Sequence, residues 1–287
     1  MAKHTIWEAR RWASSFLTEY NRETNVADLL LMHHLQCGRA QLLANARDEV
    51  DEEFFNKFQR DIHIHAEEGV PVQHLIGHEE FYGREFIVNQ HVLIPRPETE
   101  ELIVAVTEHL KKKAWLERKL NMVDVGTGSG IIAITLALEL TDVEMRAVDL
   151  SSDALHVAKQ NAATHKADVC FYEGSFLEPI MEYGDKMDVI VSNPPYIPES
   201  DRSSLSDVVV NHDPELALFA EDNGLAAYRA IVSQVPHVKA EEALLAFEIG
   251  HNQGEAVSTI ITETFPDATI SVLQDINQKD RIILAWL

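Results

Sequence analysis

The stretch that decides the fold is Val123-Asp124-Val125-Gly126-Thr127-Gly128-Ser129-Gly130, followed by the apolar residues Ile131-Ile132-Ala133-Ile134-Thr135-Leu136-Ala137-Leu138. Its beginning is typical of a buried strand, its end of an apolar helix, and the glycines between them of a tight turn. Glycines let the backbone approach a ligand closely, and the free N–H groups at a helix start favour an anionic or polar ligand. The Gly-x-Gly-x-Gly spacing differs from the patterns of dinucleotide-binding and phosphate-binding loops.

An acidic residue follows the next expected strand. Residues 143–148 have a strand pattern, and Asp149 comes directly after them, 23 residues beyond Gly126. An Asp in this place can accept hydrogen bonds from two ribose hydroxyls. It could instead cap a helix that begins near Ser151. Because the glycines and the acid are in register, we favour a nucleoside site.

A second polar motif, Asn193-Pro194-Pro195-Tyr196, follows the apolar run of residues 187–192. The Asn side-chain oxygen can accept an N–H from a planar amino group. The prolines restrict the backbone so that its carbonyls point in set directions, and Tyr196 offers a flat face for an amide or a base. The motif indicates a site that holds a planar NH2 group, although a rigid turn would also use Asn-Pro.

Strand and helix patterns alternate from about residue 96 onward. We expect strands at 121–125, 143–149, 168–172, 187–192, 243–249, 268–274 and 281–286. The last two are joined by residues 275–280 alone, which is too short for a parallel crossover, so the last strand should run antiparallel. Gly126, Asp149 and Asn193 then meet at the carboxyl ends of the strands, where open α/β sheets bind ligands.

The first part of the chain has helical periodicity and almost no strand pattern, which predicts a small helical bundle. We expect Asn25 to cap one helix and Gly38 to end it. Residues 79–89 predict a β-hairpin around Gly83. The expected parts are a helical domain of residues 1–75, a β-hairpin linker of residues 76–95 and an α/β domain of residues 96–287.

The glycine turn and the Asn-Pro-Pro-Tyr motif together resemble class I S-adenosylmethionine-dependent methyltransferases that act on a planar amino nitrogen. Phe81–Phe86 (Phe-Tyr-Gly-Arg-Glu-Phe) and Val92–Glu100 (Val-Leu-Ile-Pro-Arg-Pro-Glu-Thr-Glu) resemble the signature of the bacterial release-factor glutamine (N5) methyltransferases, as does Phe247-Glu248-Ile249-Gly250. Those enzymes methylate the glutamine of the Gly-Gly-Gln loop in class 1 peptide-chain release factors. The resemblance covers nearly the whole chain.

This resemblance implies an α/β fold, a seven-stranded Rossmann-like methyltransferase sheet behind a small helical domain that docks the protein substrate. It implies S-adenosylmethionine as cofactor and class 1 release factors as partners. Arg96 and Thr99 should border the methionine end of the cofactor, and Arg96 could instead pair with a carboxylate. The residues implied to bind the cofactor are Gly126, Thr127, Gly128, Ser129, Gly130, Asp149, Phe176 and Asn193.

For such an enzyme we expect a direct, in-line methyl transfer from sulfur to nitrogen. The Asn193 side chain would accept one N–H of the substrate amide and the Pro194 backbone carbonyl the other, while Tyr196 packs on the amide plane. Asn193, Pro194 and Tyr196 are therefore the expected catalytic residues, and Pro195 joins them in binding the substrate. Phe176 would stack on adenine, although an ordinary core Phe is the alternative.

Composition limits the alternatives. A formal charge of −23, from 47 acidic and 24 basic residues, disfavours a nucleic-acid partner and fits a basic protein. A methyltransferase of a ribosomal-protein glutamine or of an exocyclic amino group on a nucleic-acid base stays open, as do an oxidoreductase and a non-catalytic module. We expect no metal, because the two cysteines form no Cys-x-x-Cys pair and the 14 histidines are scattered.

The remaining expectations concern compartment and a loop. The amino terminus has no apolar signal core, and no apolar run approaches the roughly 20 residues that span a bilayer, so we expect a cytoplasmic protein with both thiols buried. Residues between Ile197 and Asn223 should form a long loop that could close over the substrate. The loop departs from the family pattern at Asp213-Pro214, where Glu-Pro is more usual, and at Ala220-Glu221.

Overall fold

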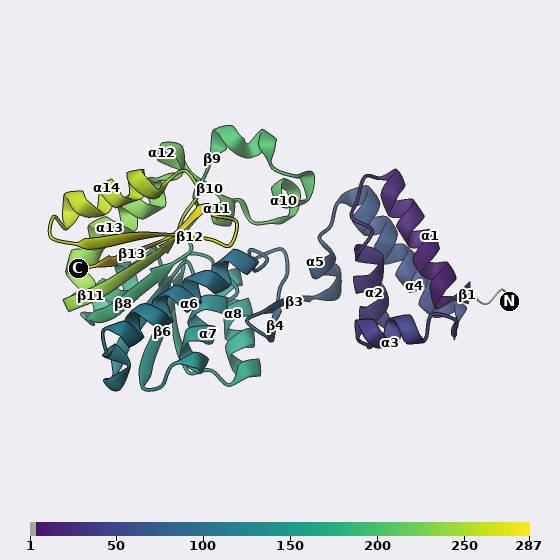
Figure 1. The fold of residues 1–287 in the computed structure, drawn as a ribbon, viewed down its shortest axis with the longest axis horizontal. Helices are drawn as coiled ribbons and strands as arrows, with labels where there is room; N and C mark the ends of the chain where they lie inside the picture. Colours follow the sequence, from purple (N-terminus) through teal and green to yellow (C-terminus); the bar gives the residue numbers. More distant parts are fainter. Residues whose placement is uncertain (1–3) are drawn as a thin grey trace. The chain divides into compact units, whose positions relative to one another are not determined.

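The computed structural model describes residues 4–287, and contacts within the chain divide them into two units. The first unit runs to His78 and also includes Ser206–His212. The second unit consists of Glu79–Leu205 and Asp213–Leu287. The chain therefore passes from one unit to the other after His78, after Leu205 and after His212 (Figure 1).

A seven-stranded sheet forms the centre of the second unit. Strand β13 runs antiparallel to both of its neighbours, and the five strands from β11 to β7 are mutually parallel. The expected fold is confirmed, including the antiparallel last strand, which lies inside the sheet and leaves β12 at the edge. In spatial order the strands are β12 (Thr269–Gln274), β13 (Asp280–Trp286), β11 (Lys239–Glu248), β8 (Met187–Ser192), β5 (Leu120–Val125), β6 (Val143–Asp149) and β7 (Val169–Glu173).

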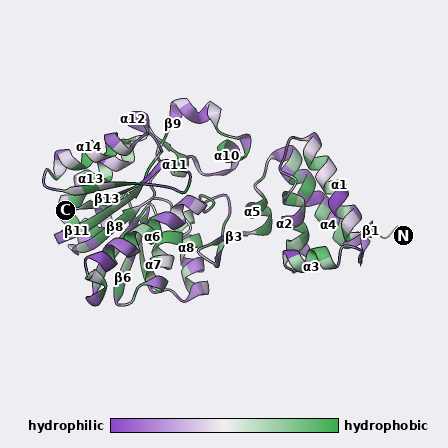
Figure 2. Cartoon of the chain, viewed as in Figure 1, coloured by the Kyte–Doolittle hydropathy of each residue, from purple (hydrophilic) through white to green (hydrophobic). Residues whose placement is uncertain are grey.

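Helices cover both faces of this sheet because side chains alternate along each strand. On β5, Met122 packs in the core under α6, α7 and α8, and Val123 packs in the core under α9, α13 and α14. Figure 2 shows hydrophobic residues concentrated along the strands. The helix bounds are α6 (Pro97–Lys112), η2 (Trp115–Glu117), α7 (Ile131–Glu139), α8 (Ser152–His165), α9 (Glu178–Tyr183), α13 (Ala226–Val238) and α14 (Gly254–Thr264).

The expected β-hairpin consists of β3 (His78–Phe81) and β4 (Arg84–Ile87). Its two turn residues, Tyr82 and Gly83, have φ values of 52° and 71°, the conformation of a tight two-residue hairpin. The Asn161 side chain on α8 accepts a hydrogen bond from the Ile87 N–H (2.7 Å) and donates one to the Ile87 carbonyl (3.1 Å). These bonds attach the end of the hairpin to α8 and so fix where residues 88–96 begin.

The first unit is a helical bundle, as expected. Thr5 begins α1 with a capping box that includes Glu8, and Asp51 caps α4. Asn25 precedes α2 but makes no side-chain capping bond, and α2 ends before Gln36, so the expectation that Gly38 ends it was wrong. The elements are β1 (His4–Thr5), α1 (Ile6–Glu19), α2 (Val26–Leu35), α3 (Arg39–Ala44), β2 (Glu49–Val50), α4 (Glu52–His63), η1 (Ile64–Glu68) and α5 (Val72–Ile76).

The segment after the Asn-Pro-Pro-Tyr motif is built of short elements rather than one open loop, and its middle belongs to the first unit. The Arg22 guanidinium donates two hydrogen bonds of 2.8 Å to the Asp207 carboxylate, and the His212 ring lies 3.0 Å from the Glu68 carbonyl oxygen. The elements are β9 (Ile197–Pro198), η3 (Glu199–Ser204), α10 (Asp207–His212), α11 (Glu215–Leu218), β10 (Phe219–Ala220) and α12 (Glu221–Gly224).

Two further expectations concern the whole chain. Over the described residues, every helix is too short or too polar to cross a membrane. The expectation that both thiols are buried was wrong, because Cys170 is exposed on edge strand β7 and Cys37 is half-buried.

Candidate functional site

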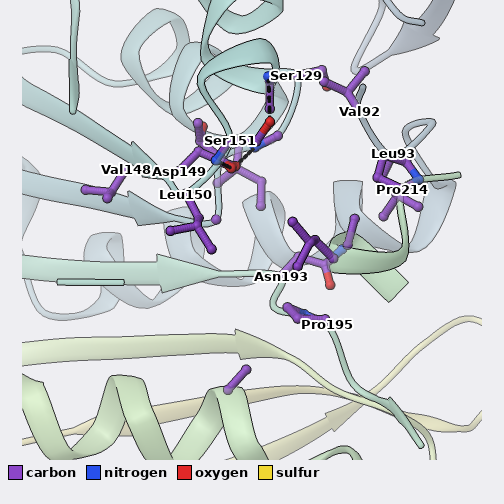
Figure 3. A pocket seen from close by; sticks show the side chains of 18 of the residues that line it. Val92, Leu93, Ser129, Val148, Asp149, Leu150, Ser151, Asn193, Pro195 and Pro214 are labelled. Carbon is purple, nitrogen blue, oxygen red and sulfur yellow. Dashed lines mark hydrogen bonds between the residues drawn. The ribbon is translucent and has the colours of Figure 1, made fainter. Parts of the chain in front are cut away.

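A cavity of about 470 Å³ opens in the second unit at the carboxyl ends of β5, β6 and β8. Its wall is formed by residues 91–96 with Thr99, the turn after β5, the end of β6, residues 174–176, the start of the Asn-Pro-Pro-Tyr motif, residues 214–220 and the start of α13. Figure 3 shows Asp149, Ser129 and Asn193 arranged around this space. The sequence prediction that the glycine turn, the acid and the Asn meet at one edge is therefore met by the geometry.

The glycines of the turn have two different tasks. Gly126 and Gly128 have φ values of 73° and 55°, line the cavity, and have open space where a side chain would begin. Gly130 (φ 86°) is outside the cavity wall, and a Cβ there would lie 2.8 Å from Ile134 Cδ1 and 3.2 Å from Ala158 Cβ. The first two glycines therefore expose backbone to a ligand, whereas the third lets α7 pack against α8.

Asp149 connects the glycine turn to the next helix. Its carboxylate accepts the Gly128 N–H at 2.8 Å and the Ser151 N–H at 2.9 Å. Ser151 itself caps α8 through its hydroxyl, so the alternative role of Asp149 as the helix cap is not the one observed. Burial raises the pKa of Asp149, while these N–H donors act in the opposite direction. Each carboxylate oxygen retains a lone pair for a further donor.

A second acid, Asp124, lies beneath the turn, and sequence reasoning assigned it no role. The Thr127 hydroxyl (2.6 Å) and the Ala133 N–H (3.2 Å) both donate to its Oδ2 atom, and within residues 4–287 its Oδ1 atom has no hydrogen-bond partner. Complete burial raises the pKa of Asp124 to about 7. An acid inside the apolar strand 122–125 was the signal that could have identified it.

The apolar wall of the cavity includes residues that the motifs did not indicate. Phe176, which we expected to stack on adenine, lines the cavity with a left-handed backbone (φ 50°). Leu150 and Leu216 also line it although they are 59% and 71% exposed, as does Leu93. Exposed apolar side chains around a cavity are typical of a surface that a ligand covers.

The four residues of the Asn-Pro-Pro-Tyr motif have different surroundings. Asn193 and Pro195 line the cavity, and Pro194 is buried behind them. Tyr196 packs against the core between the sheet and α13, and burial raises the pKa of its phenol to about 12. The Gln253 amide donates to the Tyr196 carbonyl oxygen at 3.0 Å, which holds the end of the motif in place.

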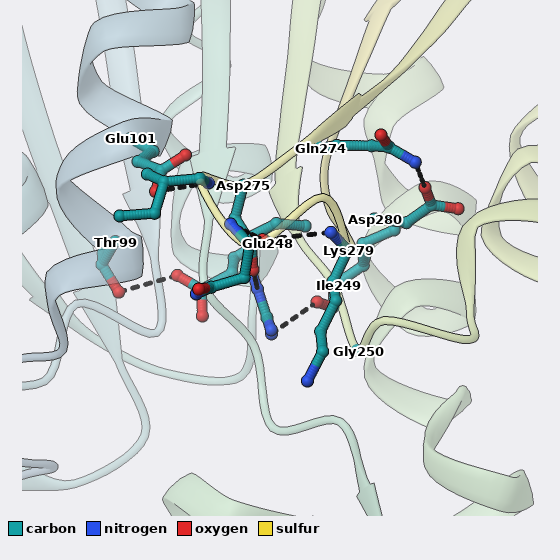
Figure 4. A network of polar contacts seen from close by, with 12 residues as sticks. Thr99, Glu101, Glu248, Ile249, Gly250, Gln274, Asp275, Lys279 and Asp280 are labelled. Atoms are coloured by element: carbon teal, nitrogen blue, oxygen red, sulfur yellow. Dashed lines mark hydrogen bonds and ion pairs between the residues drawn. The ribbon is translucent and has the colours of Figure 1, made fainter.

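Asn193 is the first member of a chain of polar contacts that crosses three elements. Its Nδ2 atom donates to Thr99 Oγ1 (3.2 Å) on α6, and the Thr99 hydroxyl donates to Glu248 Oε2 (2.7 Å) at the end of β11. Figure 4 shows the contact between Thr99 and Glu248. Burial raises the pKa of Glu248 to about 7, although the Thr99 hydroxyl and the Arg281 charge lower it.

Arg96 joins two parts of the cavity wall. Its Nη2 atom lies 3.0 Å from Asp213 Oδ2, and the Asp213 side chain is 1% exposed. Arg96 lines the cavity and also pairs with a carboxylate, so the structure is compatible with both roles left open for it. The carboxylate comes from the Asp213-Pro214 step, where the sequence departs from the family pattern. As for metals, the region 4–287 contains no cluster of three or more His, Cys, Asp and Glu side chains arranged to hold an ion.

Comparisons of sequence with known proteins indicate one family. A family model described as PrmC N-terminal domain matches residues 8–77, and one described as Methyltransferase small domain matches residues 103–213. The release factor glutamine methyltransferase of Bacillus anthracis is 48% identical over 280 residues, which is 98% of each chain, and that of Bacillus subtilis (strain 168) is 48% identical over 99% of this chain and 98% of its own. The hMettl16 catalytic domain, solved with MAT2A 3′UTR hairpin 6, has a TM-score of 0.54 at 15% identity and 82% coverage of each chain, a likeness of fold alone.

Proposed function

The chain belongs to the release factor glutamine methyltransferase family, and we propose that it transfers a methyl group from S-adenosylmethionine to the side-chain amide nitrogen, N5, of the glutamine in the Gly-Gly-Gln motif of class 1 peptide-chain release factors. The observation that carries this proposal is one cavity walled by Gly126, Gly128 and Asp149 on one side and by Asn193 on the other. Such a cavity brings a nucleoside site and an amide-binding side chain within reach of each other.

The residues of the cavity suit S-adenosylmethionine, whose positively charged sulfonium supplies an electrophilic methyl group. The open backbone at Gly126 and Gly128 admits a ligand closely, and Asp149 keeps lone pairs for two ribose hydroxyls. Phe176 offers a ring to adenine.

The chain's own residues would act on the substrate amide by orientation. An amide nitrogen is a weak nucleophile, because its lone pair is shared with the carbonyl group. We assign the Asn193 side-chain oxygen to one N–H and the Pro194 backbone carbonyl to the other, with Pro195 and Tyr196 bordering the amide plane. Holding both N–H groups directs the nitrogen lone pair toward the methyl group, and such orientation lowers the barrier without a strong base.

Residues 1–75 are the proposed docking domain for the release factor, and residues 96–287 the catalytic domain behind a hairpin linker of residues 76–95. The charge of −23 supports a basic protein surface as the partner and disfavours a nucleic-acid base as the methyl acceptor. A release factor acts in translation, so this proposed substrate also supports the expectation of a cytoplasmic enzyme.

The test is transfer of labelled methyl from S-adenosylmethionine to a purified, unmodified release factor. A release factor whose Gly-Gly-Gln glutamine is changed to Ala is the matched control. We expect label in the first protein and none in the second. Equal labelling of both, or labelling of ribosomal protein instead, would overturn the proposed substrate.

A further inference from the structure

We propose that Thr99 and Glu248 are positioning residues that decide which way round the Asn193 side-chain amide lies. The inference rests on the proposed function, in which the Asn193 oxygen accepts an N–H of the substrate. An Asn amide has one end that accepts and one end that donates, and a half-turn about its last bond exchanges them. Only one of the two orientations can bind an amide N–H through oxygen, so a neighbouring group must select it.

Hydrogen-bond donors and acceptors decide which end of the Asn193 amide faces Thr99. A hydroxyl carries a single proton, and the Glu248 carboxylate, once ionised above its pKa of about 7, can only accept. Because the Thr99 hydroxyl donates to Glu248 Oε2 (2.7 Å), its proton is committed and its lone pairs are available to the Asn193 Nδ2 group (3.2 Å). In the reversed orientation the Asn193 oxygen would face the Thr99 oxygen, two acceptors without a proton between them. These contacts, from Glu248 through Thr99 to Asn193, are called the relay below. The relay holds the Asn193 Nδ2 group on Thr99 and leaves the Asn193 Oδ1 atom for the substrate.

The burial of Thr99 and Glu248 makes the reversed orientation of the Asn193 amide costly. Thr99 is 1% exposed and Glu248 2% exposed, so water cannot easily replace either partner. In such surroundings an unpaired polar group is costly and a satisfied network is rigid. Backbone contacts hold both residues as well: the Thr99 N–H donates to the Arg96 carbonyl oxygen (3.1 Å), and the Tyr228 hydroxyl donates to the Glu248 carbonyl oxygen (2.9 Å).

The three residues of the relay come from separate elements, and the packing of these elements brings them together. Pro97 begins α6 and places Thr99 in the first turn, Glu248 ends β11, and Asn193 follows β8. The last pair between β8 and β11 is Ser192 with Phe247, so Asn193 and Glu248 are the next residues on two adjacent strands. Glu248 is still paired with Ile282 of β13. Thr99 on α6 then bridges them.

A purely structural role, in which Thr99 merely joins α6 to β11, makes different predictions from a positioning role. Thr99→Val keeps the size of the side chain but removes the hydroxyl, whereas Thr99→Ser keeps the hydroxyl. Thr107→Val is a matched control, because Thr107 lies on the same helix and its hydroxyl has no hydrogen-bond partner among residues 4–287. Glu248→Leu and Glu248→Gln form a second pair, of which only Gln can still accept from Thr99.

The first readout is the single-turnover rate of methyl transfer at saturating cofactor and release factor. We expect Thr99→Val to lower it about 10- to 100-fold and Thr99→Ser and Thr107→Val to stay within about threefold of the unmodified chain. Adding Thr99→Val to Asn193→Ala should cost no further rate, because the relay acts only through Asn193. An equal loss in Thr99→Val and Thr99→Ser, or additive losses with Asn193→Ala, would overturn the inference.

The second readout needs no release factor. Nitrogen-15 labelling of Asn side chains gives an NH2 signal for Asn193, assigned by its loss in Asn193→Ala. We expect one of its protons to exchange slowly with solvent in the unmodified chain and in Thr99→Ser, and at least about tenfold faster in Thr99→Val. A signal that Thr99→Val leaves unchanged refutes the relay even if the methylation assay succeeds. A signal that responds as expected in a chain that fails to label any release factor supports the relay and overturns the proposed substrate.

Discussion

At the scale of single residues, the Asn193 side chain is the one proposed to bind the substrate amide, and other side chains hold it in position. Asn193 and Thr99 line the cavity, and Thr99 and Glu248 are almost completely buried. Sequence reasoning identified Asn193 from its neighbours Pro194 and Pro195, because a motif is local. It could not connect Asn193 to Glu248, since that contact depends on two strands and a helix packing together.

Asn193→Ala is the most direct test at this scale. The variant loses the acceptor for the substrate amide but keeps the glycine turn and Asp149, so we expect the rate of methyl transfer to fall about 100-fold or more. The Kd for S-adenosylmethionine, measured by calorimetry, should change less than about threefold. An unchanged transfer rate would remove Asn193 from the catalytic assignment.

Glu248 should make stability depend on pH. Its pKa is raised from 4.5 to about 7 in the folded chain, chiefly by burial; Arg281 and Arg96 act against this shift, and Glu98 adds to it. Between those two values the folded chain holds a proton that the unfolded chain has released, so the free energy of unfolding falls as pH rises from about 4.5 to about 7.

The comparison with Glu248→Gln isolates this effect, because the glutamine carries no titrating proton. In urea unfolding at several pH values, the variant should gain stability relative to the unmodified chain between about pH 4.5 and 7 and stay level above that range. A difference in unfolding free energy that does not vary with pH would contradict the assignment of the raised pKa to Glu248.

At the scale of elements, the turn between β5 and α7 combines ligand access with helix packing. Gly130→Ala would place a Cβ 2.8 Å from Ile134 Cδ1 in a left-handed backbone, which should destabilise the fold by about 2–4 kcal/mol. Gly126→Ala meets open space, so only backbone strain of about 1–2 kcal/mol is expected, together with weaker cofactor binding. Urea unfolding and cofactor titration of both variants measure the contrast, and equal losses of stability would contradict it.

Helix α10 is held in the first unit by a charged contact. The Arg22 side chain is 15% exposed and that of Asp207 is 57% exposed, so solvent screens the pair and its contribution is about 1 kcal/mol. Arg22→Ala should speed amide hydrogen exchange in residues 207–212 about fivefold. Arg229→Ala, which breaks the more exposed pair with Asp222, is the control and should leave exchange in α10 unchanged. No acceleration in Arg22→Ala would mean that other contacts hold the helix.

At the scale of the whole molecule, net charge should act on the partner more than on the cofactor. A charge of −23 attracts a basic protein surface over distances that salt screens. Raising ionic strength from about 0.05 M to about 0.3 M should lower kcat/KM for the release factor roughly threefold or more, with a smaller change in the Kd for S-adenosylmethionine. A salt-independent kcat/KM would show that charge does not steer the encounter.

The sequence by itself determined the architecture of the second unit and the place of its site. Strand and helix periods, the glycine turn and the short connection 275–280 all depend on residues near one another in the chain. Parallel strands joined by helices bring their carboxyl ends to one edge, so the order of the elements along the chain is enough to place Gly126, Asp149 and Asn193 together.

Only the tertiary structure decided what depends on packing between distant residues. The antiparallel strand β13 lies inside the sheet because it pairs with both β11 and β12. Helix α10 belongs to the first unit through Arg22, and the relay from Glu248 reaches Thr99 across 149 residues of sequence. Local periodicity records which side chains are buried. It does not record which distant side chain each one meets, because that choice follows from the mutual fit of elements in the folded chain.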